Sequence, residues 1–94
     1  MNITKFGETY NINEDKGSYK ISGDLIETVQ GNVIVNVNTL DENEQVISSI
    51  NGDYLVLDNA FNFRFMTAID RKEEQLEIIK LVTDAIEQIL NDEV

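Results

Sequence analysis

The chain of 94 residues contains no histidine, cysteine, proline or tryptophan. Without histidine and cysteine it has no Ser-His-Asp triad, no cysteine nucleophile and none of the usual zinc ligands. A disulfide is excluded as well, so the fold must be stabilised by packing alone, as is usual for proteins of a reducing cytosol. We therefore expect a cytoplasmic protein that is not an enzyme and holds neither a metal nor a cofactor.

Long apolar runs are also missing from the sequence. A membrane-spanning helix needs about 20 predominantly apolar residues, so none is expected. The first residues lack the apolar core of a secretory signal, and we expect no signal peptide. Apolar residues nevertheless make up 41 % of the chain, which is ordinary for a globular protein and predicts one folded domain over residues 1–94.

Negative charge is in clear excess, with 18 Asp and Glu against 7 Lys and Arg and a net charge of −11. Such a surface repels nucleic acid and attracts basic proteins, so we expect no direct binding of nucleic acid, and no membrane partner. The acidic residues are spread along the whole chain, so no detachable acidic tail is expected. The charge favours a basic protein partner, whereas the competing interpretation is that it serves solubility only.

Turn residues and alternating apolar residues predict strands over residues 1–69. Glu14-Asp15-Lys16-Gly17 predicts a hairpin that closes with a left-handed glycine. Gly31-Asn32 predicts a two-residue turn, and counting outward from it places Ile26 opposite Val37. Ile26 should then share the core face with Val33, Val35 and Val37.

A third turn is predicted at Asn51-Gly52, because both residues tolerate the positive φ of a type I′ turn. Its register places Ser49 opposite Tyr54, and residues 46–49 and 54–57 become the two arms of a hairpin. After it, Phe61, Phe63 and Phe65 alternate with polar residues. This row predicts a strand whose aromatic face packs in the core under a helix.

The period changes at Asp70, where Asp70 and Glu73 fit a capping box that opens a helix over residues 70–92. The fold class is therefore α+β: an antiparallel meander of five or six strands with one C-terminal helix packed on the sheet. The apolar arc of this helix spans about 220°, wider than one sheet contact needs. Either the sheet curls around the helix, or the helix also forms an oligomer interface through Ile78, Leu81 and Ile89.

Carboxylates are the only abundant groups able to carry function. Asp41, Asn43 and Gln45 alternate as in a calcium loop, but an EF-hand needs Gly at position six and Glu at position twelve, and Val46 and Gly52 stand there. We therefore expect no metal site. The candidate partner-binding residues lie in one acidic loop and along one side of the helix: Asp41, Glu42, Glu44, Glu73, Glu77, Asp84 and Glu87.

These features predict a small binding protein that presents ordered carboxylates to a basic, nucleic-acid-binding host protein, much as a nucleic-acid strand does. Small acidic inhibitors from phages and other mobile elements have this composition. One alternative is a structural module that forms homodimers through the helix. Another is a carrier with a pocket lined by the Phe row, although no motif in the sequence marks such a pocket.

Overall fold

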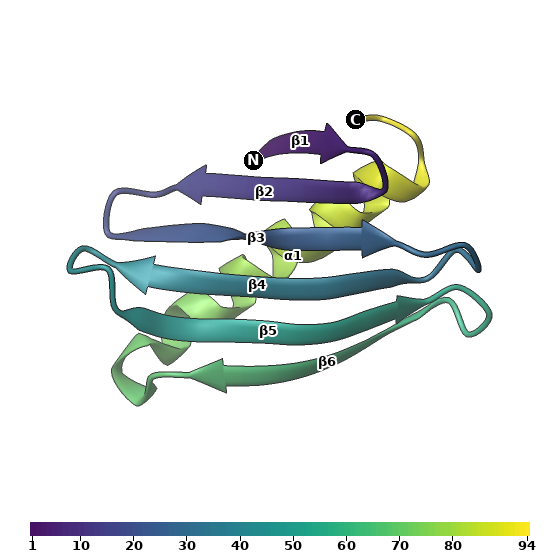
Figure 1. Cartoon of the computed structure of the whole chain (residues 1–94). Coiled ribbons are helices and arrows are strands. Elements are labelled where there is room, and N and C mark those ends of the chain that lie inside the picture. Colours follow the sequence, from purple (N-terminus) through teal and green to yellow (C-terminus); the bar gives the residue numbers. More distant parts are fainter.

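The computed structural model describes all 94 residues and contains one sheet and one helical segment. Each strand pairs antiparallel with the next, so the order in the sheet is the order in the chain (Figure 1). This confirms the α+β meander with a C-terminal helix. The strands are β1 Asn2–Phe6, β2 Thr9–Asp15, β3 Tyr19–Glu27, β4 Val33–Asp41, β5 Val46–Leu55 and β6 Ala60–Thr67, followed by the 3₁₀-helix η1 Ile69–Glu74 and the α-helix α1 Gln75–Leu90.

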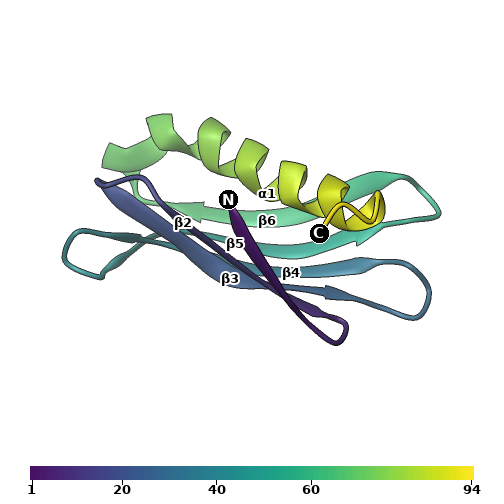
Figure 2. The same ribbon diagram turned by 90° about the horizontal axis from the view of Figure 1, so that it is seen from above.

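The molecule has two layers, with η1 and α1 on one face of the twisted sheet and the other face open (Figure 2). Helix α1 crosses the sheet diagonally, from the end of β6 to the corner near β1 (Figure 1). We call the covered side the inner face and the open side the outer face. Buried apolar residues from the inner face pack against Ile78, Val82, Ala85, Ile86 and Ile89 of the helix. No helix combines the length and the apolar character that crossing a membrane requires.

The β2–β3 hairpin lies where the sequence predicts it. Gly17 has φ +85°, and the Lys16 N–H donates to the Tyr19 carbonyl at 2.9 Å. The Asp15 carboxylate also accepts the Gly17 N–H at 2.8 Å. The turn is therefore tighter than the expected four-residue loop, because the hydrogen bond closes around Gly17 and Ser18 alone.

The β3–β4 register predicted from Gly31-Asn32 is wrong. The connection is a loop of residues 28–32, closed by the Thr28 N–H, which donates to the Asn32 carbonyl at 2.8 Å. Leu25 therefore pairs with Val35, and Ile26 pairs with Ile34 instead of Val37. Leu25 is fully buried, whereas Ile26 lies on the outer face. The longer loop shifts the pairing by an odd number of residues, which moves each side chain to the opposite face.

The turn predicted at Asn51-Gly52 is also wrong, since both residues lie within β5 and pair on both sides, with β4 and with β6. Ser49 faces Asn38 and Met66, not Tyr54. The actual turns are residues 42–45 before β5 and residues 56–59 after it. Gly52 is still needed for its backbone: its φ is +147°, and a Cβ there would lie 2.0 Å from the Asn62 carbonyl oxygen.

The predicted capping box does not form. Neither η1 nor α1 has a side-chain cap, and the α-helix begins at Gln75 rather than at Asp70. Residues 69–74 instead wind as a 3₁₀-helix while the chain reverses from β6 onto the inner face. Gln75 is fixed to the sheet, because its carboxamide oxygen accepts hydrogen bonds from Ser48 and Thr67. The first α-helical residue is thus set by contacts with β5 and β6, which the local sequence does not encode.

Candidate functional site

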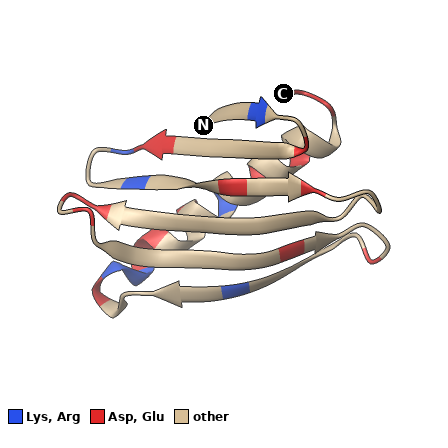
Figure 3. Ribbon diagram, in the orientation of Figure 1, with Lys and Arg blue, Asp and Glu red and all other residues tan.

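Three connecting segments lie at one end of the molecule: the β2–β3 turn with Lys16, the acidic β4–β5 loop, and η1, which carries Asp70, Glu73 and Glu74 together with Arg71 and Lys72 (Figure 3). Arg71 of η1 donates to the Ser18 carbonyl at 3.3 Å, which ties η1 to the β2–β3 turn. The hydrogen bond and charge of Glu74 and the charge of Asp70 raise the pKa of Arg71, and the Asp41 charge makes a small further contribution. We call this region the carboxylate end, and its residues are Asp41, Glu42, Glu44, Asp70 and Glu73.

The β4–β5 loop holds its carboxylates in a fixed conformation. The Asp41 carboxylate accepts the Asn43 N–H at 2.8 Å and the Gln45 N–H at 2.9 Å. The Glu44 N–H donates to the Asp41 carbonyl at 3.0 Å, and Glu44 adopts φ +63°. Asp41 is therefore a structural residue of the loop. Glu42 and Glu44 are exposed and project from an ordered backbone.

The arginine at this end is already paired. The Arg71 guanidinium contacts both Glu74 oxygens, at 2.6 and 3.0 Å. This hydrogen bond to Glu74 is the main reason why the pKa of Arg71 is raised. A two-point Arg–carboxylate contact is more specific in geometry than a single one. The charges of Arg71 and Glu74 thus neutralise each other. The neighbouring carboxylates of Asp70 and Glu73 form no ion pair.

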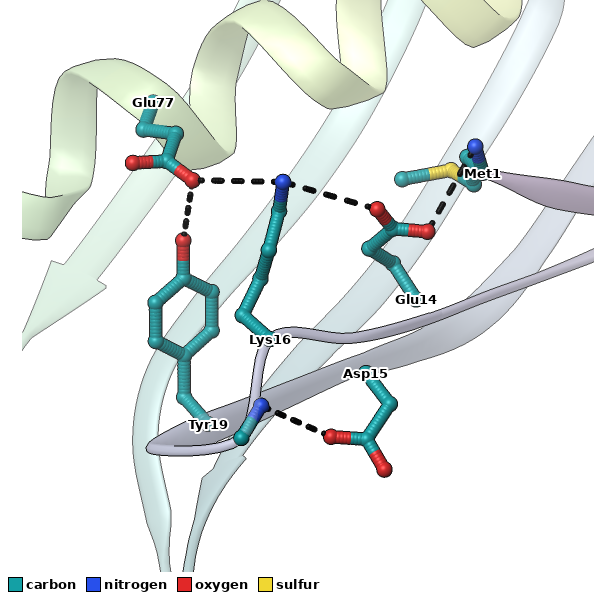
Figure 4. A network of polar contacts seen from close by, with 7 residues as sticks. Met1, Glu14, Asp15, Lys16, Tyr19 and Glu77 are labelled. Atoms are coloured by element: carbon teal, nitrogen blue, oxygen red, sulfur yellow. Dashed lines mark hydrogen bonds and ion pairs between the residues drawn. The ribbon is translucent and has the colours of Figure 1, made fainter.

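Glu77 belongs to a different polar network, between the first turn of α1 and the β2–β3 hairpin (Figure 4). The Tyr19 hydroxyl donates to Glu77 at 2.7 Å, and Lys16 lies 3.7 Å from Glu77 and 3.6 Å from Glu14. Burial raises the pKa of Tyr19, and the hydrogen bond to Glu77 together with nearby carboxylates raises it further. Glu77 therefore fastens the helix to the sheet and is a poor candidate for partner contact.

The remaining predicted helix residues lie away from the carboxylate end. Asp84 pairs with Lys80 at 2.7 Å, and this contact raises the pKa of Lys80. Glu87 is exposed one turn further along. The ten residues from Glu77 to Glu87 span about 15 Å of helix axis. The segments that carry Asp41, Glu42, Glu44 and Glu73 thus lie at the same end of the molecule, whereas Asp84 and Glu87 lie on the later half of α1.

Asp70 is the functional candidate that the sequence interpretation missed. Its place before a run of helix formers suggested a helix cap, yet it is exposed in η1 and forms no cap. Over the whole chain, only Glu14, Glu74, Glu77 and Asp84 of the eighteen acidic residues take part in ion pairs. The other fourteen carboxylates form no ion pair.

The apolar residues predicted to form an oligomer interface lie in or against the core of their own chain. Ile78 and Ile89 are buried in the core of their own chain, and Leu81 is partly buried against that core. Of the aromatic row, only Phe63 is partly buried against the core; Phe61 contacts the buried Tyr54 ring but is 43 % exposed, and Phe65 is 50 % exposed. The expectation that the whole row packs under the helix is therefore wrong, because α1 crosses β6 only near the strand's end (Figure 1).

No pocket opens in the surface, and no group of acidic side chains is arranged to hold a metal ion. The chain matches no protein-family model, no curated protein and no solved structure.

Proposed function

We propose that this chain is a non-enzymatic binding protein that docks its carboxylate end on a basic, nucleic-acid-binding protein and thereby competes with nucleic acid. The observation that carries the proposal is that the β4–β5 loop, with Glu42 and Glu44, and η1, with Asp70 and Glu73, lie at the same end of the molecule, and that none of these four carboxylates forms an ion pair. Basic grooves that bind nucleic acid attract such charge at long range. The carboxylates of this end stand where phosphate oxygens would otherwise bind.

Rigidity supports the same assignment. The two hydrogen bonds to the Asp41 carboxylate fix the loop that carries Glu42 and Glu44. Arg71 fixes η1 against the β2–β3 turn. A surface that is ordered before binding loses less conformational entropy when the partner docks. Charge that served solubility alone would not require an ordered loop.

The test uses purified nucleic-acid-binding proteins of the host cell, each loaded with a fluorescent oligonucleotide. The chain should displace the oligonucleotide from its target, and the displacement should weaken steeply as salt rises. Neutralising the carboxylate end with E42Q, E44Q, D70N and E73Q together should abolish displacement. Asp41 is left unchanged because the loop depends on it.

The matched control neutralises four exposed or partly exposed carboxylates elsewhere, with D53N, D58N, D92N and E93Q. It has the same net charge as the first variant, so it separates location from total charge. It should retain most of the displacement. Equal losses in the two variants would mean that bulk charge alone acts, and the proposed docking surface would be wrong.

A further inference from the structure

Strand β6 forms one edge of the sheet, and no further strand lies beyond it (Figure 1). The Ala68 N–H donates to the Ile47 carbonyl at 2.8 Å. This bond shows which residues of β6 are hydrogen-bonded to β5. Because hydrogen-bonded pairs alternate along an antiparallel ladder, the even-numbered residues of β6 bond to β5. Phe61, Phe63 and Phe65 therefore turn their backbone N–H and C=O groups to the open side.

Arg64 is the only residue of β6 that protects this edge. Natural edge strands are usually short, charged or interrupted by proline or a bulge. β6 has eight residues, and its aromatic rings follow one another at 5.2 Å from Phe61 to Phe63 and 6.1 Å from Phe63 to Phe65. By comparison, the opposite edge strand β1 has five residues and carries Lys5. β6 is thus the edge that is open to another strand.

Charge indicates which strand would bind there. Two copies of a chain with net charge −11 repel each other over most of their surface. β6 contains no acidic residue, and its single charge, Arg64, takes part in no ion pair. An approach along β6 therefore brings two copies together where the repulsion is weakest.

We propose that β6 pairs antiparallel with β6 of a second copy, about a two-fold axis at Phe63, so that one sheet continues through a homodimer. In this register Phe63 faces Phe63, Phe61 faces Phe65, and Asn62 faces Arg64 of the other copy. All the free backbone groups of Phe61, Phe63 and Phe65 then find partners. Both helices lie on the same side of the continuous sheet.

The same register matches side chains on both faces. On the inner face the half-exposed rings of Phe61 and Phe65 meet across the axis and lose their contact with water. On the outer face Arg64 of the second copy faces Asn62, which pairs with Asp53 in its own sheet, so the register brings no like charges face to face.

The first test is the mass in solution, measured by analytical ultracentrifugation over a range of concentrations. The native chain should be a dimer, and the dimer should tighten with salt because the copies repel each other. F65K should be a monomer, since it places a charge against the aromatic row of the other copy. The matched control F6K alters an apolar residue of the other edge strand, which is 65 % exposed, and should stay dimeric.

The second test fixes the register by cross-linking, which the absence of native cysteine makes clean. N62C and R64C are prepared separately and mixed under mild oxidation. Facing residues of an antiparallel pair have Cα atoms about 4.5–5.5 Å apart, which suits a disulfide. The mixture should form a covalent dimer, and each variant alone should form little.

A native chain that is monomeric at every concentration would overturn the proposal, as would an F65K variant that stays dimeric or a mixture that fails to cross-link. Loss of the dimer in F6K would assign the interface to β1 and would also overturn it. These outcomes are independent of the docking proposal, because partner binding should weaken with salt whereas the dimer should tighten.

Discussion

The two faces of the sheet are built from the same strands in alternation, yet they have opposite chemistry. The inner face carries buried apolar side chains, including Ile12, Ile21, Leu25, Val35 and Ile50. The outer face is polar and close to neutral, with Asp15, Asp24 and Asp53 against Lys20 and Arg64. Amides form its largest group of uncharged side chains, namely Asn2, Asn11, Asn13, Asn36, Asn38, Asn51 and Asn62.

This contrast shows how the chain separates stability from surface charge. The inner face and α1 supply the burial that stabilises so small a domain. Most of the negative charge lies in the loops, at the strand ends and on the helical segment (Figure 3). Charge is thereby kept away from both the core and the open edge of β6. The following substitutions test this division of roles, from the largest expected effect to the smallest.

Gly52→Ala should destabilise the chain most. Gly52 lies on the inner face within β5, where its φ of +147° and the Asn62 carbonyl exclude a Cβ. The strain alone costs on the order of 1–3 kcal/mol, and displacing β6 adds to it. Urea denaturation should therefore show a loss of about 3 kcal/mol or more. Gly7→Ala is the control: Gly7 also has a positive φ, +63°, but a Cβ there meets nothing within 4 Å, so this variant should lose only the part that backbone strain accounts for. Equal losses would indicate that Gly52 is a simple turn residue.

Leu25→Ala should cost about 3 kcal/mol, because Leu25 is fully buried and truncation leaves a cavity. Ile26→Ala, one residue later on the outer face, should cost less than about 1 kcal/mol, since Ile26 is 38 % exposed. The difference between the two urea midpoints reports the register of β3. A larger loss for Ile26→Ala would support the register predicted from Gly31-Asn32.

The errors in register have a common physical origin. Gly31-Asn32 and Asn51-Gly52 are both good turn dipeptides, but a turn preference is small compared with the burial gained or lost by a whole strand. Pairing on both sides keeps Asn51-Gly52 in β5, and Glu44 adopts the positive φ in the actual turn. The strand character, the helix and the acidic loop were predictable because each depends on local pattern.

The carboxylate end was only partly predictable for a related reason. The sequence identifies Asp41, Glu42, Glu44 and Glu73 as acidic, but it does not show that η1 folds back against the β2–β3 turn, at the same end of the molecule as the β4–β5 loop. That placement depends on Arg71, which bonds to Glu74 and to the Ser18 carbonyl far away in the chain. It also depends on Tyr19, which binds Glu77 and turns that carboxylate towards the sheet.

Tyr19→Phe tests the anchor between the inner face and α1. Removing a hydrogen bond to a charged acceptor should cost about 1.5–3 kcal/mol at neutral pH. The pKa of Tyr19 is higher in the folded chain than in the unfolded chain. The Tyr19 hydroxyl therefore contributes fully to stability below about pH 10, and this contribution is lost as the pH rises through the folded pKa. Wild-type stability should therefore fall more steeply above about pH 10 than that of Tyr19→Phe.

The control for this prediction is Tyr54→Phe, which removes a 2.8 Å hydrogen bond to the neutral Asn59 carboxamide. It should cost about 1 kcal/mol, less than Tyr19→Phe. The free energy of unfolding is measured by urea denaturation at each pH. If it falls equally with rising pH in wild type and Tyr19→Phe, Glu77 does not stabilise the neutral phenol.

Thr39→Val should produce the smallest change in the free energy of unfolding, and the only increase. Thr39 is buried on the inner face, and its hydroxyl has no hydrogen-bond partner. Valine has nearly the same shape, so the substitution removes the cost of an unpaired buried hydroxyl and should stabilise by about 1 kcal/mol. Thr39→Ser keeps the hydroxyl and loses the methyl group, so it should destabilise by about the same amount. If Thr39→Val were destabilising instead, the hydroxyl would have a partner such as a buried water, and polar groups on the inner face would contribute to stability as the apolar ones do.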